Sequence, residues 1–296
     1  MLPLNKDLQS QKENIEEFKN LTIRILDYLP NVLSSHADKH EYRIFESKIA
    51  GTSKFIRPIN TKLFLFNSDE FRIKFDEFCD ILRALKEKNQ LGSNENRQLI
   101  NSVTYTIQQA MGAGFDVLVN PNSARKHVGN RFEELIRAIF KEIEIPSKRV
   151  VLQIPYQTDE GIRNYKCEND LILTPFKKVL SNNKNLNEKE LVISVKTTSK
   201  DRMSKMFIDK LLLEKFIGHK QKFIGIFLND VQRKKSDNIS FTLVSGLFMV
   251  YTKFLVELEG IYYVDPPPNA NKAPFNNHMK TFGDLLVDDI WELLTP

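Results

Sequence analysis

Apolar residues recur at steps of three and four through much of the chain before residue 120. This spacing gathers apolar side chains on one face of a helix. It predicts three amphipathic helices, over residues 14–29, 70–88 and 96–111. Turn-forming residues between positions 118 and 130 then interrupt the pattern. We therefore expect residues 1–120 to form a helical N-terminal subdomain.

After this interruption the pattern changes to an alternation of helices and strands. Short runs rich in Val, Ile and Leu predict strands, and longer stretches with the helical spacing predict helices. The expected elements are a helix at 130–144, strands at 149–155, 169–174 and 191–197, a helix at 202–217 and a strand at 222–228. This order is typical of an α/β (α+β) fold in which helices flank a mixed sheet. We expect that core, with a C-terminal extension, over residues 121–296.

The C-terminal extension has a less regular pattern. Residues 240–258 are compatible with a strand or a helix, residues 261–264 predict a short strand, and residues 282–294 predict a last helix that packs Trp291. The chain contains no linker long enough to separate independent domains. The N-terminal helices are therefore expected to wrap around the sheet.

Composition narrows the possible classes of function. Of the 296 residues, 41% are hydrophobic, which is enough to build a sizeable core. No window approaches the roughly 18 apolar residues of a membrane span, and the N-terminus is too polar for a signal peptide, so we expect a cytoplasmic protein. Cys79 and Cys167 lack the spacing of zinc ligands or of a disulfide framework. The absence of a GxxxxGK[ST] motif argues against a nucleotide cofactor.

The charge distribution adds one further indication. A net charge of +5 is compatible with a polyanionic partner but is not specific for one. Lys and Arg concentrate at residues 196–222 and again at 232–238. This distribution indicates either a local basic surface or a solvated helix face followed by a charged turn.

Two charged residues lie on strands whose neighbours predict burial. Asp170 opens the run DLILTP, and Lys196 ends the run LVISVK. Both runs are typical of strands that are buried on both faces. Because α/β proteins usually hold their chemistry at the ends of sheet strands, these two side chains are candidate functional residues.

Two acidic residues lie on the apolar faces of predicted helices. Asp209 shares its face with Met206 and Leu213, so its carboxylate is expected to need a cation or a metal ion as partner. Glu133 is likewise surrounded by apolar positions at steps of three and four. Its neighbour Glu134 falls on the charged face and is expected to be ordinary surface.

Together these four residues are suited to metal-assisted phosphodiester hydrolysis. Carboxylates such as Asp170, Asp209 and Glu133 hold Mg²⁺, and the metal polarises the phosphate and acidifies a water molecule. An ammonium group such as that of Lys196 orients this water or offsets developing negative charge. For each position taken alone the alternative is a buried salt bridge, for instance between Lys196 and Asp170.

The segments END at 168–170 and SVK at 194–196 resemble the catalytic motif of the PD-(D/E)XK nucleases. The resemblance is specifically to type II restriction endonucleases that cut sites containing CCGG or CCNGG, and it covers about residues 129–215. Ser194 occupies the position of the second acid of the motif. In the group that the chain resembles, a serine or another non-acidic residue commonly stands at this position, and the acid comes from the next helix instead. Asp209 matches that displaced position, with Glu214 as the alternative.

Two further segments carry the resemblance. GNRFEELI at 129–136 is similar to the helix that bears the upstream acid of the group, and the match falls on Glu133. KDR at 200–202 is similar to the Arg-rich motif that reads C·G pairs, with Lys200 in place of the usual arginine. Arg202 would bond to guanine O6 and N7, and Asp201 would accept from cytosine N4. The alternative is that Asp201 or Ser199 caps the helix while Lys200 and Arg202 contact phosphates.

The resemblance implies a Mg²⁺-dependent type II restriction endonuclease of a prokaryotic cytoplasm, which cuts double-stranded DNA and leaves 5′-phosphate ends. A palindromic site implies a homodimer, or further assembly into a tetramer. The N-terminal subdomain would then contact DNA or form the dimer interface. Two alternatives remain open, namely a repair or structure-specific nuclease of the same fold and a catalytically silent DNA-binding protein.

Overall fold

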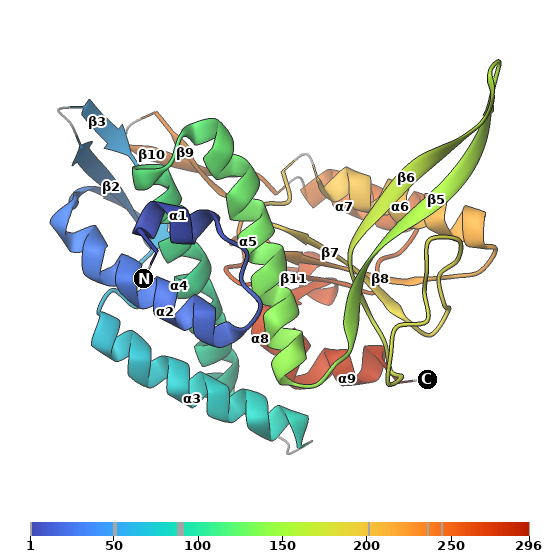
Figure 1. Cartoon of the computed structure of the whole chain (residues 1–296), viewed down its shortest axis with the longest axis horizontal. Helices are drawn as coiled ribbons and strands as arrows, with labels where there is room; N and C mark the ends of the chain where they lie inside the picture. Colours follow the sequence, from blue (N-terminus) through green and yellow to red (C-terminus); the bar gives the residue numbers. More distant parts are fainter. Residues whose placement is uncertain are drawn as a thin grey trace.

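A computed structural model describes residues 2–49, 52–87, 92–200, 202–235, 237–243 and 245–295. The three helices predicted for the N-terminal region are present. The first two differ from their expected bounds by at most two residues at each end, whereas the third continues to Leu118, seven residues beyond its expected end. The helices of this region, which pack together on one side of the molecule (Figure 1), are α1 (Leu4–Gln9), α2 (Ile15–Tyr28), η1 (Leu29–Asn31), α3 (Ser68–Lys86) and α4 (Asn94–Leu118).

An antiparallel sheet lies between these helices along the chain and was not among the predicted elements. Its strands are β1 (Leu33–Lys39), β2 (Tyr42–Ile49), β3 (Thr52–Phe55) and β4 (Ile59–Asn60). β1 reads LSSHADK and is largely exposed. Because few of its residues are apolar, the strand has no hydrophobic alternation from which it could be recognised.

The helix expected at 130–144 begins nine residues earlier, as α5 (Pro121–Glu142). The prediction of a break up to residue 130 was therefore wrong. Pro121 lies at the first helical position, where the missing N–H of proline costs no hydrogen bond. Gly129 lies inside the helix, and a Cβ at that position would meet open space. Neither residue ends the helix in this context.

The central sheet has the strand order β12–β11–β8–β7–β6–β5 within the described residues. β5, β6 and β7 pair antiparallel, whereas β7, β8, β11 and β12 pair parallel. The α/β fold with a mixed sheet is thereby confirmed. The elements that form or join this sheet are β5 (Ser147–Thr158), β6 (Gly161–Leu173), β7 (Leu191–Lys196), α6 (Met203–Ile217), β8 (Lys222–Phe227), β11 (Gly260–Tyr263), η2 (Phe275–Asn277) and β12 (Met279–Thr281).

Hydrophobic clusters cover both faces of this sheet. Ile193 and Val195 of β7 join the cluster that includes residues of α4 and α5, whereas Val192 joins a second cluster with residues of α6 and of α7 (Ser245–Phe254). A strand that is covered on both sides needs apolar residues at every position. This burial explains the unbroken run that ends at Lys196.

β5 and β6 form a long hairpin that projects from the body of the molecule (Figure 1). Their inner halves were predicted as separate short strands, but the strands continue outward and meet at a turn after Thr158. Exposed residues of the outer half include Tyr156 and Ile162. The outer half lacks the apolar run of a buried strand, and so the pattern did not reveal it.

The ambiguous segment 240–258 contains both kinds of structure. β9 (Val231–Lys234) and β10 (Asn238–Phe241) form a hairpin, and α7 (Ser245–Phe254) follows. The C-terminal helical segment comprises α8 (Phe282–Asp284), the π-helical turn η3 (Leu285–Asp289) and α9 (Ile290–Leu293). Trp291 packs against the cluster that includes α4 and α5. No helix in the described ranges is long and apolar enough to cross a membrane.

A buried carboxylate joins the N-terminal sheet to the central sheet. Asp265, which follows β11, accepts hydrogen bonds from Tyr42 Oη at 3.0 Å and from Asn60 Nδ2 at 2.9 Å. Burial raises the pKa of Asp265 to about 7. The protonated acid is therefore the favoured form of this group in the folded protein at mildly acidic pH.

We expect the contribution of Asp265 to the free energy of unfolding to depend on pH. Its folded pKa lies above the unfolded value of about 3.9, so its contribution is present below pH 4 and is lost as pH rises through about 7. Asp265→Asn should remove this dependence. Urea unfolding at several pH values measures this effect. Between pH 5 and pH 8 the free energy of unfolding of the variant should rise relative to that of the wild type by at least about 1 kcal/mol. A difference that stays constant with pH would contradict this assignment.

Candidate active site

Asp170 lies at an irregularity of the central sheet. The pairing register shifts near the inner end of the hairpin, so Asp170 and Leu171 of β6 lie opposite the single residue Arg149 of β5. Such bulges re-aim side chains and are frequent beside active sites. The bulge lies where β6 leaves the exposed hairpin and begins to pair with β7. Asp170 is thereby placed at the edge of the buried part of the sheet.

Three groups of β7 converge on one oxygen of the Asp170 carboxylate. Oδ2 accepts hydrogen bonds from the backbone N–H of Val195 at 2.9 Å and from Ser194 Oγ at 3.3 Å. Lys196 Nζ donates to the same oxygen. This arrangement holds Asp170 against the end of β7. It also contains the Lys196–Asp170 salt bridge, which the sequence analysis gave as the alternative to a catalytic role for these residues.

Glu133 approaches Lys196 from α5. Its Oε1 lies 3.5 Å from Lys196 Nζ, and its side chain is half-buried. Burial raises the pKa of Glu133, the negative charge of Asp170 raises it further, and Lys196 acts in the opposite direction. Glu133 therefore belongs to the same electrostatic group as Asp170 and Lys196.

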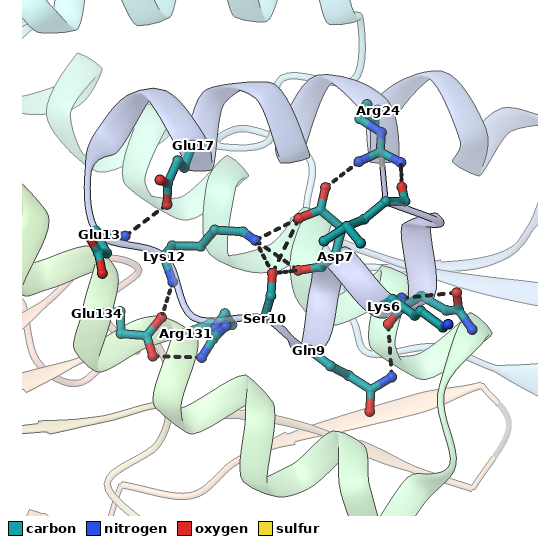
Figure 2. Close-up of polar contacts among 12 residues, drawn as sticks. Lys6, Asp7, Gln9, Ser10, Lys12, Glu13, Glu17, Arg24, Arg131 and Glu134 are labelled. Carbon is teal, nitrogen blue, oxygen red and sulfur yellow. Dashed lines mark hydrogen bonds and ion pairs between the residues drawn. The ribbon is translucent and has the colours of Figure 1, made fainter.

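The neighbouring Glu134 is more buried than Glu133, and its prediction as ordinary surface was wrong. It accepts hydrogen bonds from the backbone N–H of Lys12 at 2.9 Å and from Arg131 Nη2 at 2.6 Å. Lys12 in turn donates to Asp7 at 2.7 Å (Figure 2). The N-terminal segment is thus attached to the helix that presents Glu133, a contact between distant parts of the chain that periodicity does not reveal.

A pocket of about 240 Å³ brings most of the predicted residues together. Asp170 reaches it from β6, Ser194 and Lys196 from β7, and Asp209 from α6. Glu133 is not among the described residues that line it, and contacts Lys196 from outside. The complete lining consists of Tyr165, Lys166, Glu168, Asp170, Ser194, Lys196, Arg202, Lys205, Met206 and Asp209.

Asp209 lies on the pocket wall rather than in the apolar interior. Its two carboxylate oxygens lie 2.7 and 2.5 Å from Nζ of Lys205, one turn earlier on α6. Its side chain is 19% exposed, and Lys205 is the cationic partner that its place on the apolar face led us to expect. The pocket interrupts the apolar face of α6 at this point, which a helical pattern alone does not show.

Glu214, the alternative acid, is engaged at the other end of α6. It accepts a hydrogen bond from the backbone N–H of Gln221 at 3.0 Å and lies 3.8 Å from Lys210. It is not among the described residues that line the pocket. The geometry therefore favours Asp209 over Glu214 as the acid supplied by this helix.

The segment after β7 carries the predicted base-reading residues. Lys200 is exposed and donates to Gln232 at 3.3 Å, while Arg202 is exposed and lines the pocket. Asp201 lies outside the described residues. The Ser199 hydroxyl donates to Asp230 at 2.6 Å instead of capping α6, so capping by Ser199 is excluded as the explanation of this motif.

The lining residues that the sequence did not single out include Lys205 and Glu168. Lys205 could have been identified from its four-residue spacing to Asp209, which places both on one helix face. Glu168 lies two residues before Asp170 on β6, and it is paired with Arg149 at 2.5 Å. In the described parts of the chain no three His, Cys, Asp or Glu side chains form a group that could hold a metal by themselves.

No family model and no curated protein sequence matches the chain. In structure the chain is similar to the type IIP restriction endonuclease Kpn2I, with a TM-score of 0.71 and 19% identity over 95% of this chain and 91% of that chain. It is also similar to the restriction endonuclease PspGI in its complex with substrate DNA, with a TM-score of 0.44 and 13% identity over 76% of this chain and 92% of that chain. The likeness to Kpn2I shows that the chain has a restriction-endonuclease-like fold.

Proposed function

We infer that the chain is a Mg²⁺-dependent, site-specific DNA endonuclease of the type II restriction class. The observation that carries this proposal is that Asp170, Lys196 and Asp209 line one pocket, formed by β6 and β7 of the central sheet and by α6. The fold that holds the pocket is shared with a type IIP restriction endonuclease. A pocket lined by two aspartates and a lysine at a strand end is suited to metal-assisted phosphodiester hydrolysis.

The residues of the pocket suit Mg²⁺ as the cofactor. Mg²⁺ is usually held by one or two carboxylates, with water and substrate phosphates completing its coordination. Asp170 and Asp209 are two such carboxylates, contributed by β6 and α6. Glu133 would support the site through a water molecule, because it contacts Lys196 and is not among the described residues that line the pocket. When bound, the metal would neutralise phosphate charge and acidify the attacking water.

Lys196 is the residue we assign to the attacking water. Its ammonium group lies between Asp170 and Glu133, which fixes its direction at the end of β7. It would donate a hydrogen bond to the water that attacks phosphorus opposite the 3′ oxygen. The new P–O bond forms as the P–O3′ bond breaks, so the product carries a 5′ phosphate.

Lys200, Asp201 and Arg202 are the residues we assign to base recognition. Arg202 would donate two hydrogen bonds to a guanine, Asp201 would accept from cytosine, and Lys200 would donate to a neighbouring guanine. Such a set reads C·G pairs, which supports a palindromic site containing CCGG or CCNGG. A two-fold symmetric site is most simply bound by a homodimer, alone or within a tetramer.

Digestion of a fully sequenced plasmid tests this function. With Mg²⁺ we expect discrete fragments with 5′-phosphate ends at sites containing CCGG or CCNGG, and with EDTA no cleavage. Cleavage confined to branched or damaged DNA would instead indicate a structure-specific nuclease. Gel shifts without cleavage in both Mg²⁺ and Mn²⁺ would indicate a silent DNA-binding protein.

The same assay distinguishes the two candidate acids of α6. Asp209→Asn should lower the cleavage rate by about 100-fold, because it removes one proposed metal-binding carboxylate. Glu214→Gln keeps an oxygen for the backbone N–H of Gln221 and should stay within a few-fold of the wild type. The opposite ranking of the two variants would assign the acid to Glu214.

A further inference from the structure

A fully buried carboxylate anchors the segment that joins β7 to α6. Asp230 Oδ1 accepts hydrogen bonds from Thr198 Oγ1 at 3.0 Å and from the backbone N–H of Ser199 at 2.7 Å. Its Oδ2 accepts from Ser199 Oγ at 2.6 Å and from Tyr263 Oη at 2.8 Å. Three of these four hydrogen bonds come from the joining segment, and the fourth comes from β11.

The position of Asp230 in the fold is itself well defined. It follows β8, and two backbone hydrogen bonds extend the pairing of β7 with β8 beyond the strands, from Leu228 to Lys196 at 3.2 Å and from Asn229 to Thr197 at 3.4 Å. The backbone carbonyl of Asp230 also accepts from the backbone N–H of Thr242 at 2.9 Å. The anchor is therefore attached to the central sheet and to the segment that follows the β9–β10 hairpin.

No Lys, Arg or His in the described ranges forms an ion pair with Asp230, which is 0% exposed. The hydrogen-bond donors to this carboxylate among the described residues are neutral hydroxyl and backbone N–H groups. Burying an ionised group is costly, and an apolar residue would fill the same space at lower cost. The hydrogen bonds therefore give Asp230 a positional role that an apolar residue would not have.

Ser199 connects Asp230 to the start of α6. Its backbone carbonyl accepts hydrogen bonds from the N–H groups of Arg202 and Met203, both at 2.9 Å, and these are the first bonds of the helix. Because Asp230 holds both the backbone and the hydroxyl of Ser199, it fixes where α6 begins. The side chains of Lys200 and Arg202 extend from this fixed turn.

We propose that Asp230 is a positioning residue for sequence recognition, which holds Thr198 and Ser199 so that Lys200 and Arg202 meet the base edges in a single register. This inference rests on the proposed function. Asp230 contacts neither Asp170 nor the ammonium group of Lys196, which are held by β6 and β7. Loss of the anchor should therefore reduce discrimination between DNA sites more than it reduces the cleavage rate at the correct site.

Two matched variants separate this role from a general contribution to stability. Ser199→Ala and Tyr263→Phe each remove one hydroxyl hydrogen bond to the same oxygen of Asp230, at 2.6 and 2.8 Å. Only Ser199 belongs to the segment that carries the recognition residues. Asp230→Asn, which keeps the shape of the side chain, tests the carboxylate itself, and thermal unfolding establishes that each variant is folded.

The measurement is the ratio of kcat/KM at the correct site to that at sites changed by one base pair, at constant salt concentration. We expect this ratio to fall about 10-fold in Ser199→Ala and Asp230→Asn, which corresponds to the loss of one base contact. Tyr263→Phe should stay within twofold of the wild type. Hydrogen exchange of the peptide that contains residues 197–203 should accelerate in the first two variants and not in the third.

Equal effects of Ser199→Ala and Tyr263→Phe, or unchanged discrimination in folded Asp230→Asn, would overturn the inference while leaving the proposed function intact. A wild-type protein that cuts or binds DNA without sequence preference would overturn both. The two failures are thus distinguished by the wild-type protein alone.

Discussion

Asp170→Asn is expected to abolish DNA cleavage while leaving the fold and DNA binding intact. Asparagine keeps an oxygen that can accept from the backbone N–H of Val195, so the local geometry of β6 and β7 is preserved. The variant loses the negative charge that contacts Lys196 and would hold Mg²⁺. Because a catalytic metal supplies several kcal/mol of charge stabilisation, the rate should fall by about 10³-fold or more.

Single-turnover cleavage of end-labelled DNA measures this loss, and gel shifts measure binding separately. Binding should be equal to or tighter than that of the wild type, because a carboxylate no longer faces the DNA phosphates. Glu168→Gln is the matched control, since Glu168 lines the same pocket but is paired with Arg149. A rate for Asp170→Asn within tenfold of that of Glu168→Gln would reject Asp170 as a metal ligand.

The second large effect is expected in stability. Lys210 is buried on α6, and its ammonium group donates to the backbone carbonyl of Glu257 at 2.7 Å and to both carboxylate oxygens of Glu259, at 2.7 and 2.9 Å. Lys210→Met fills similar space but leaves the Glu259 carboxylate without its cation. Removal of one partner of a buried ion pair typically lowers the free energy of unfolding by about 3–5 kcal/mol. Since Glu259 is partly exposed, we expect a loss of about 3 kcal/mol.

Urea unfolding at neutral pH measures this loss. Lys205→Met on the same helix is the control, because Lys205 forms an exposed pair with Asp209 that should contribute less than about 0.5 kcal/mol. The double variant Lys210→Met with Glu259→Gln should recover part of the stability, since it also neutralises the Glu259 carboxylate that Lys210→Met leaves without its cation. Equal losses in Lys210→Met and Lys205→Met would show that the Lys210–Glu259 pair adds little.

Local pattern was sufficient for elements whose apolar residues follow a regular spacing or an unbroken run. The helices α2 and α3 were predicted close to their observed bounds because their burial repeats with the helical period, whereas α4 was located but continues seven residues further. The strands β7 and β8 were predicted from unbroken apolar runs, because both of their faces are covered. The same pattern was insufficient for β1, which is polar and exposed. It was also insufficient for the outer half of the β5–β6 hairpin, where neither face is covered.

For the candidate site, the sequence identified charges on surfaces expected to be apolar but not the partners of those charges. Asp170, Lys196 and Asp209 were identified in this way, and the structure brings them to one pocket. Glu134 was misassigned because its partner, the backbone N–H of Lys12, lies 122 residues away in the chain. Lys210 was not identified as buried, because its partner Glu259 lies on another segment.

The sequence by itself determined the order of the core helices and strands, the mixed sheet and the candidate residues at the strand ends, since these depend on periodicity and on short spacings. Only the tertiary structure decided which acid of α6 lines the pocket, where the Ser199 hydroxyl points, and that Asp230 and Asp265 are buried. The physical reason is that the cost of burying a polar group, and the partner that offsets it, depend on contacts between segments far apart in the chain.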